Sequence, residues 1–474
     1  MASATRQPPV VLLAAALLVA VALDVSAQPD ASQAPQAPRG PLTLGRAVEL
    51  AVAGNPGLEA TRLKGRQIQA MLDESRAAFL PMVGANYSFF RSDWPHMIIA
   101  QAIDAHAFPE NGYFNYPGTY TIYSAIVEGR MNLWAGGRDL ARRRLLTTAT
   151  EICGTENDMA RNALVGQVIE SFFEVLAAGE RLTHAEKLVR TVRARRDETA
   201  GRFAEGAVLR ADLVDVEARL AEAEAGVVHV SAARLRGLAS LAIALGLPAA
   251  SDLAPADTPD ALAATPEEYG AGLAQALRTR PELARARLMT RRFELGVSIA
   301  KSELLPRLDT AAAIGSYRDG NPIPEISRDQ KVWYATVMLS WELFDGGARQ
   351  ARIAKANAEL DEFREVDRKT TLEVELDVRK AYLRIGEARA ALQAAERRLE
   401  AAREMRDVRQ TQHEAGAATL ASALEGEQML TDALMGRTNA DFELRKAHAD
   451  AGRALGLFAA RVDGSSCCGA AARP

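Results

Sequence analysis

The chain has 474 residues, of which 48% are hydrophobic and 25% are charged, and its net charge is −4 at neutral pH. This length suits two or three ordinary domains, and the near-neutral charge gives no basis for nucleic-acid binding. The three cysteines are too few for a disulfide framework, and the six histidines are scattered. Without a phosphate-binding loop or a nucleophile elbow, the sequence predicts no enzymatic activity, no metal site and no cofactor.

Residues 1–27 are predicted to be a cleaved signal peptide. Arg6 supplies a weakly basic start, residues 10–23 form an apolar core, and Val-Ser-Ala at 25–27 is a small-residue cleavage site. The apolar run is short for a membrane span, so a retained anchor is the less favoured alternative. No later apolar run approaches ~20 residues, so the sequence is predicted to contain no other helical membrane span. A flexible N-terminal segment is expected at 28–42.

The rest of the sequence reads as an internal repeat. NPGLEATRL at 55–63 matches RPELARARL at 280–288 (offset 280 − 55 = 225), and LWAGG at 133–137 matches LFDGG at 343–347 (offset 343 − 133 = 210). The first half therefore carries 15 extra residues (225 − 210), which we place in the Pro-, Gly- and Asn-rich loop at 92–118. The predicted domains are a first repeat at 43–250, an equatorial linker at 251–266, a second repeat at 267–457 and a flexible tail at 458–474.

Each half begins with a helix-period stretch, at about 44–80 and 267–305, that ends in Leu-Pro, where proline stops a helix. Strands of about ten residues follow, each with one apolar and one polar face, as is typical of a transmembrane β-barrel. The alternative is a soluble hairpin on a core, but charged residues on the polar face argue against it. The predicted apolar face comprises Val83, Ala85, Tyr87, Phe89, Tyr123, Ala125, Val127, Met131, Leu133, Leu308, Thr310, Ala312, Ile314, Trp333, Ala335, Val337, Leu339, Trp341 and Leu343. The polar face comprises Gly84, Asn86, Ser88, Ser124, Glu128, Arg130, Asn132, Thr336, Ser340 and Glu342.

A Gly-Gly pair ends each strand region and is predicted to mark the change from strand to helix, because glycine tolerates a sharp change of backbone direction. The pairs are Gly136-Gly137 and Gly346-Gly347. Long helices are expected at about 138–203 and 348–413, each roughly 100 Å long at ~1.5 Å per residue. Apolar residues recur every seven positions along both, which predicts coiled-coil packing. They are Val168, Val175, Leu182 and Val189, and Val378, Ile385, Leu392 and Leu399.

Each long helix is expected to reverse at a glycine turn, at 203–207 and 413–417, and to be followed by a helix of about half its length, at roughly 209–246 and 419–456. Two half-length helices can then lie end to end beside each long helix. Two hairpins give four strands per chain. Four strands cannot close a barrel, and open edges are not tolerated in lipid, so the barrel must be shared between copies of the chain.

With this order of features, the chain resembles the outer-membrane efflux protein (TolC-like) family from Leu42 to Leu457. The resemblance rests on the duplicated layout, the Leu-Pro before each strand region, the LFDGG junction and the Ala-Gly turns. It implies an α+β membrane protein: a homotrimer with a shared twelve-strand barrel in the outer membrane and a periplasmic coiled-coil tunnel. The implied partners are a membrane-fusion adaptor and an inner-membrane pump of RND, ABC or MFS type.

The implied function is a passive exit duct for efflux or type I secretion. A soluble periplasmic coiled-coil adaptor or scaffold is the main alternative, and a general porin is a weaker one that leaves the long helices unexplained. Strand counting alone also allows an eight-strand dimer, but eight strands leave little lumen.

The resemblance further implies two sites at the tip of the tunnel. The family carries inward acidic side chains six and nine residues after each turn glycine, and here these positions hold Asp212, Asp215, Ser422 and Glu425. Three rings of carboxylates in a trimer would attract cations, whereas the plainer alternative is a solvated helix face. The family's adaptor-docking hairpin corresponds to Gly206, Ala207, Val208 and Leu209, and to Gly416, Ala417 and Ala418, although a tight turn alone also explains the glycines. A tyrosine and an arginine that latch some members shut are replaced by His413 and Ala418.

Overall fold

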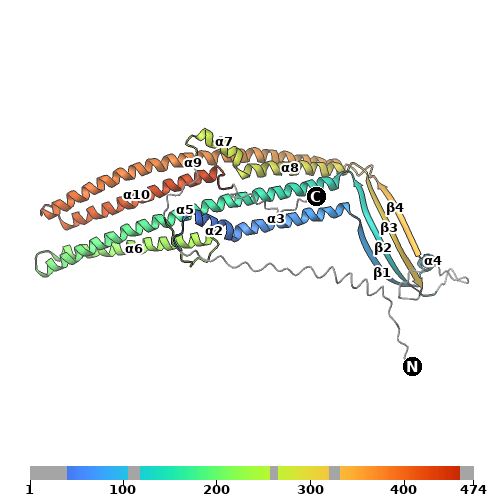
Figure 1. The fold of residues 1–474 in the computed structure, drawn as a ribbon, viewed down its shortest axis with the longest axis horizontal. Coiled ribbons are helices and arrows are strands. Elements are labelled where there is room, and N and C mark those ends of the chain that lie inside the picture. Colours follow the sequence, from blue (N-terminus) through green and yellow to red (C-terminus); the bar gives the residue numbers. More distant parts are fainter. Residues whose placement is uncertain (1–39, 105–117, 257–264, 320–330, 460–474) are drawn as a thin grey trace, which may run out of the picture.

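A computed structural model describes residues 40–104, 118–256, 265–319 and 331–459. Long helices form an elongated body with a four-stranded sheet at one end (Figure 1). The predicted signal peptide and the Cys467-Cys468 pair lie outside the described residues. In chain order the elements are α2 (Leu44–Gly54), α3 (Pro56–Glu74), the 3₁₀-helix η1 (Ser75–Phe79), β1 (Met82–Ser92), α4 (Pro95–Asp104), β2 (Tyr120–Ala135), α5 (Arg138–Ala204), α6 (Arg210–Ala244), α7 (Tyr269–Thr279), α8 (Pro281–Ser302), β3 (Arg307–Asp319), β4 (Lys331–Ser340), α9 (Ala348–Glu414) and α10 (Leu420–Ala454).

The two long helices, α5 and α9, are each 67 residues long and start and end within one residue of the predicted positions. At ~1.5 Å per residue each is about 100 Å long. Of the predicted heptad residues, Leu182 and Leu392 are half-buried and the other six are buried. The heptad pattern therefore identified the faces along which the long helices pack.

Shorter helices cover each long helix in two halves. α6 lies along the tip half of α5 and α3 along the half nearer the sheet, and α10 and α8 do the same for α9 (Figure 1). Each helix-period stretch predicted at the start of a half contains two α-helices, because α2 and α3 break at Pro56, and α7 and α8 break at Pro281. Asn55 and Arg280, which precede these prolines, are extended, with ψ of 120° and 121°. Proline disfavours the helical conformation of the residue before it, which explains both breaks.

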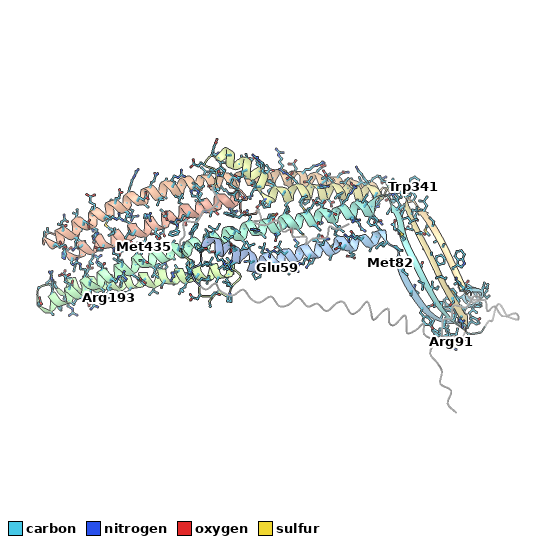
Figure 2. The ribbon with its side chains drawn as sticks, viewed as in Figure 1. Glu59, Met82, Arg91, Arg193, Trp341 and Met435 are labelled. Atoms are coloured by element: carbon cyan, nitrogen blue, oxygen red, sulfur yellow. The ribbon has the colours of Figure 1, made fainter. Side chains whose placement is uncertain are left out.

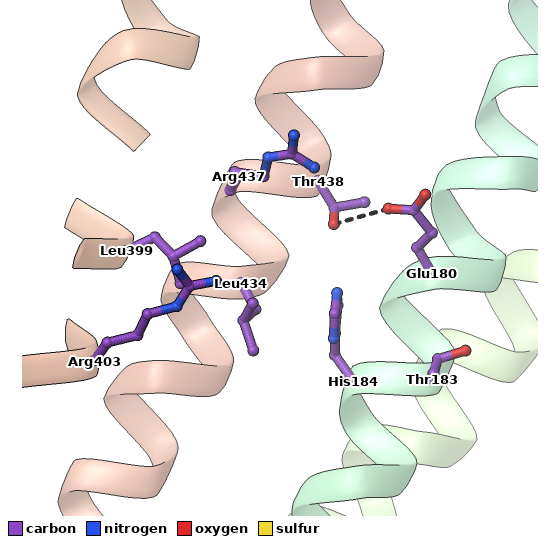
Figure 3. A pocket seen from close by; sticks show the side chains of 8 residues that line it. All are labelled: Glu180, Thr183, His184, Leu399, Arg403, Leu434, Arg437 and Thr438. Atoms are coloured by element: carbon purple, nitrogen blue, oxygen red, sulfur yellow. Dashed lines mark hydrogen bonds between the residues drawn. The ribbon is translucent and has the colours of Figure 1, made fainter. Parts of the chain in front are cut away.

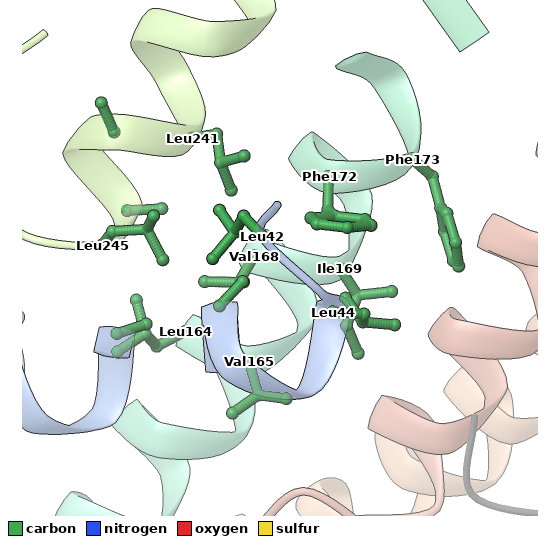
Figure 4. Close-up of a cluster of buried hydrophobic side chains, with 14 of the residues drawn as sticks. Leu42, Leu44, Leu164, Val165, Val168, Ile169, Phe172, Phe173, Leu241 and Leu245 are labelled. Atoms are coloured by element: carbon green, nitrogen blue, oxygen red, sulfur yellow. The ribbon is translucent and has the colours of Figure 1, made fainter. Parts of the chain in front are cut away.

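A core lies at the equator of the helical body, where α2 and the end of α6 meet the middle of α5 (Figure 4). Phe172, Val168 and Leu241 are fully buried there. Leu42 completes this core and also ties it to the linker, because its N–H donates to the Ala254 carbonyl (2.8 Å). The equator therefore fixes the point at which each long helix changes partners.

The antiparallel sheet has the order β1-β2-β3-β4. One row of paired residues runs across all four strands through Ala85, Val127, Ile314 and Trp333. All four belong to the predicted apolar face, so the predicted alternation holds across the sheet at this level. Val127, Ile314 and Trp333 are 46%, 41% and 73% exposed, as suits side chains that face lipid.

On the opposite face of the sheet, the charged residues Glu128 and Arg130 are paired with each other. Tyr334 donates to Glu128 (2.6 Å), and so does Arg130 (2.8 Å). Tyr334 reaches from β4 to β2 across Ala313 of β3, because Ala313 pairs with both Glu128 and Tyr334 and its side chain is small. A connected polar face of this kind suits a water-filled lumen.

Two details of the strand prediction were wrong. The register shifts between Asn132 and Trp134, so Trp134 instead of Leu133 stands opposite Leu308. Such a bulge inserts one residue and changes the alternation beyond it. The fourth strand ends at Ser340, so the predicted strand residues in 341–345 are not part of the sheet.

The long loop predicted at 92–118 contains a helix. In α4, Ile98 and Ala102 are four residues apart and 4% and 1% exposed. This face packs against β2 and β3, where Ile122 is also buried. Residues 105–117 of the predicted loop are outside the described part of the chain.

By length and composition alone, α6 could cross a membrane, because its most apolar 18-residue window has a mean hydropathy of 1.3. The sequence-based exclusion of such a helix was too strict by this measure. Only 22% of that window is buried. Along the same helix, four exposed residues at seven-residue spacing form an apolar stripe, called the α6 stripe below: Val214, Ala221, Val228 and Leu235.

Candidate functional site

The two turns at the far tip of the helical body have the same hydrogen bonding. After α5, the Ala207 N–H donates to the Arg202 carbonyl (2.8 Å) and the Gly206 N–H to the Phe203 carbonyl (2.9 Å). After α9, Ala417 and Gly416 make the equivalent bonds at 2.8 and 2.9 Å. This Schellman arrangement requires a left-handed residue, and both glycines have φ near +74° (74° and 73°). The turn glycines therefore have a structural role whatever else they do.

The predicted docking residues form the outermost surface of these turns. Val208 and Ala418 are half-buried, and the other five are exposed. Leu209 is 73% exposed although it is a large apolar side chain, and its N–H donates to the Asp212 carboxylate (3.1 Å). The exposed leucine makes the tip apolar, and the very small side chains beside it allow another molecule to approach closely.

The predicted gate residues do not form one cluster. Asp212 caps the start of α6 through the Leu209 N–H. Asp215 accepts a hydrogen bond from Arg219 Nε (3.1 Å), one helical turn away. Ser422 is bonded through its backbone, with its N–H donating to Thr419 Oγ1 (3.2 Å). Asp212 therefore has a capping role in this structure, while Asp215 belongs to an ion network.

That network joins the two halves of the chain at the tip. Glu425 of α10 accepts from Arg409 of α9 (2.9 Å) and lies 3.9 Å from Arg219 of α6. Arg219, Arg409 and Glu425 are 28%, 24% and 53% exposed, so each pair contributes about 0–1 kcal/mol. Sequence analysis missed both arginines, although the four-residue spacing of Asp215 and Arg219 was a usable signal.

His413, which stands where some family members have a latching residue, makes a local contact. Its Nδ1 lies 3.2 Å from the Ala418 carbonyl, so with the proton on Nδ1 it closes its own turn. Within the described residues, α6 and α10 are linked at the tip by the Arg219–Glu425 pair and by Leu424, which belongs to one apolar cluster with Val216 and Leu220.

The strand-to-helix junctions lie at the other end of the long helices. All four predicted glycines are left-handed, with φ of 62° and 81° at Gly136 and Gly137, and 71° and 88° at Gly346 and Gly347. A Cβ on Gly136 would lie 2.5 Å from the Ser302 carbonyl oxygen, whereas one on Gly346 would meet nothing within 4 Å. The first junction therefore also requires glycine for packing against the end of α8.

The sequence profile of the outer membrane efflux protein family matches residues 47–247 and 272–456. These two segments cover most of the chain. The chain belongs to the outer membrane efflux protein family. The protein is therefore located in the outer membrane, and its family and structural neighbours are channel proteins.

Individual proteins agree with this assignment. The chain is 25% identical over 319 residues to the fusaric acid resistance protein FusA of Burkholderia cepacia, covering 66% of this chain and 57% of FusA. It is 25% identical over 421 residues to the alkaline protease secretion protein AprF of Pseudomonas aeruginosa, covering 84% and 81%. The Campylobacter jejuni CmeC outer membrane channel superposes with a TM-score of 0.75 at 17% identity, covering 87% of this chain and 85% of CmeC. The fold is TolC-like.

A groove of about 290 Å³ lies between α5 and the α9–α10 pair, between the equator and the tip (Figure 3). Thr438 donates to Glu180 across it (3.1 Å), and burial lowers the pKa of His184. Apart from the heptad residue Leu399, its lining was not predicted, because it forms where side chains from distant segments meet. The lining residues are Glu180, Thr183, His184, Leu399, Arg403, Leu434, Arg437 and Thr438.

Proposed function

We propose that the chain is the exit duct of a tripartite efflux or type I secretion system, which passively conducts substrates from an adaptor–pump complex across the periplasm and outer membrane. The proposal rests on one observation: the same chain contains a sheet with an apolar face and two helices of 67 residues each. The sheet suits lipid, and helices about 100 Å long suit the periplasm. The pump can be of RND, ABC or MFS type.

The working unit is proposed to be a homotrimer formed by a tandem-repeat chain. Within the described residues, β1 and β4 are each paired on one side only, and such edges are not tolerated in lipid. Three chains of four strands make a twelve-strand barrel, which leaves room for a passage. The exposed α6 stripe has the seven-residue spacing of a coiled-coil seam, and we assign it to a neighbouring copy.

The names of the two relatives support different cargoes, since FusA is a resistance protein and AprF a secretion protein. The proposed duct can be tested without knowing which cargo it carries. Purified protein should be a heat-modifiable trimer by light scattering and gel mobility, and it should conduct ions in a planar bilayer. A monomer, or a trimer that never conducts, would contradict the duct and favour a scaffold.

The tip is proposed to be a gate in which Asp212, Asp215 and Glu425 surround a constriction and the Ser422 position adds no charge. Arg219 and Arg409 offset two of the three carboxylates, so one net negative charge per chain remains (3 − 2). The gate should therefore attract cations more weakly than three unpaired acidic rings would.

Removing these charges should change block by cations. We expect wild-type trimers to show small, cation-selective conductance that multivalent cations block from the periplasmic side. Replacing Asp212, Asp215 and Glu425 with alanine should weaken block and selectivity, with only a modest rise in conductance, because helix packing closes the tube. Arg219→Gln with Arg409→Gln should instead lower the half-blocking concentration by roughly fivefold to tenfold, because the arginines no longer offset the carboxylates and cation binding gains about 1 kcal/mol.

The control for these variants is Arg193→Gln, which breaks the Arg193–Glu224 pair farther along α5 and α6. It should leave block unchanged. If the acidic and arginine variants behave like this control, the acids are ordinary solvated surface and the gate lies elsewhere.

The adaptor is proposed to dock on the tip turns, at Gly206, Ala207, Val208, Leu209, Gly416, Ala417 and Ala418. Their small side chains allow helix tips of a partner to approach closely, and Leu209 offers apolar area. Leu209→Asp should reduce co-purification of the adaptor at least tenfold (about 1.4 kcal/mol), because a charge would be buried at the contact. The variant should remain a heat-modifiable trimer, and undiminished adaptor binding would contradict docking at this surface.

A further inference from the structure

The segment that follows β4, residues 341–345, has no partner strand in the described part of the chain. Its equivalent in the first half, 131–135, extends β2 beyond the start of β1. That extension pairs with β3 alone. In the first half, β3 holds the equivalent segment in strand form. Within the described residues, the second half has no strand in that position.

The sheet obeys the repeat offsets residue by residue. Met82 pairs with Arg130 in the first hairpin, and Arg307 pairs with Ser340 in the second. These are equivalent positions, since 82 + 225 = 307 and 130 + 210 = 340. The offsets found in the sequence thus reproduce the register of one hairpin from the other, so they can be applied to the β2–β3 junction as well.

We infer that β4 of one chain pairs antiparallel with β1 of a second copy in the register of the β2–β3 pair. The pairs Gly129–Ala312 and Arg130–Ala311 then become Leu339–Tyr87 and Ser340–Asn86 between chains. The pair Trp134–Leu308 becomes Phe344–Val83, with Leu343 as the bulged residue. Residues 341–345 become strand on assembly. This inference rests on the proposed shared barrel and specifies the partner and the register.

Three independent features agree with this register. Met82 and Trp341 lie at the same end of the sheet, so an added copy of β1 runs antiparallel to β4 (Figure 2). Leu339 and Tyr87 are 67% and 54% exposed and both belong to the apolar face. A slip of one residue would place Leu339 opposite a polar-face position such as Ser88, which violates the two-residue alternation of strands.

Engineered cysteines test the register. In a background carrying Cys153→Ala, Cys467→Ala and Cys468→Ala, we expect Ser340→Cys with Asn86→Cys to form a disulfide on mild oxidation. Directly opposite Cβ atoms are about 4.5–5.5 Å apart, close to disulfide geometry. Within one chain β1 and β4 are separated by two strands, about 14 Å, so this bond can only join two copies.

Two matched pairs control for slips that preserve the alternation, namely Ser340→Cys with Gly84→Cys and Ser340→Cys with Ser88→Cys. Their cysteines would be diagonal neighbours about 7–8 Å apart and should cross-link far less. Leu339→Cys with Tyr87→Cys repeats the test on the other face. Successive pairs along two antiparallel strands alternate between hydrogen-bonded and non-hydrogen-bonded, so the two faces carry different types of pair.

The expected result is a covalent trimer on a denaturing gel for at least one predicted pair, which reverts to monomer with reductant. Cross-linking confined to the slipped pairs would overturn the register while leaving the shared barrel intact. Heat-modifiable trimers that cross-link at no pair would overturn the closure of β4 on β1. A protein that forms no trimer at all would overturn the proposed function together with this inference.

Discussion

Val337→Arg is expected to prevent most of the chain from reaching the assembled, heat-modifiable form in the outer membrane. Val337 is 67% exposed and pairs with Thr310 on the apolar face of the sheet. An arginine facing lipid near the bilayer midplane costs roughly 2–4 kcal/mol. A trimeric barrel would contain three such arginines, so this cost would arise three times. The measurement is the fraction of folded trimer in purified outer membranes.

Thr336→Arg is the matched control because it adds the same charge one residue away. Thr336 pairs with Ala311 on the polar face, so its side chain points into the proposed lumen. The guanidinium there remains in water, and assembly should be close to that of wild type. Equal damage from both substitutions would mean that neither face of the sheet is reserved for lipid.

Much of the fold could be predicted because each type of element has its own local pattern in the sequence. Seven-residue spacing identified the packed faces of α5 and α9, and two-residue alternation identified the row through Ala85, Val127, Ile314 and Trp333. The Gly-Gly pairs were recognisable because left-handed backbone at a junction favours glycine. Each of these signals depends on residues that are close together in the sequence, so it can be recognised without knowing the fold.

The parts that could not be predicted depend on contacts between distant segments. The Arg409–Glu425 pair joins two helices across a turn, and its geometry depends on how α9 and α10 pack. The bulge at Leu133 depends on the register between the two halves. α4 was hidden because Pro, Gly and Asn around it obscured the four-residue spacing of Ile98 and Ala102. We attribute the early end of β4 to another cause: in the proposed shared barrel, the strand beside residues 341–345 belongs to a second copy.

The two junctions provide a test that separates folding within a chain from assembly between chains. Gly136→Ala must adopt a left-handed backbone at φ 62°, which costs about 1–2 kcal/mol. Its Cβ would also lie 2.5 Å from the Ser302 carbonyl oxygen and 2.9 Å from Leu305 Cβ. Such overpacking costs typically about 1–3 kcal/mol more. Gly137→Ala carries the left-handed strain alone, because its Cβ would meet nothing within 4 Å.

Gly346→Ala is expected to destabilise the trimer about as much as Gly136→Ala, although nothing in its own chain lies within 4 Å of the added Cβ. In the inferred assembly the equivalents of Ser302 and Leu305 are Ala77 and Leu80 of a second copy (302 − 225 and 305 − 225). The Ala77 carbonyl would then meet the new Cβ, and about 1–3 kcal/mol of overpacking would add to the strain. Gly347→Ala isolates that strain, since its φ is 88° and its surroundings are open. The measurement is the temperature at which trimers dissociate on semi-native gels. A Gly346→Ala trimer that dissociates at the temperature of Gly347→Ala would show that no second copy covers this junction.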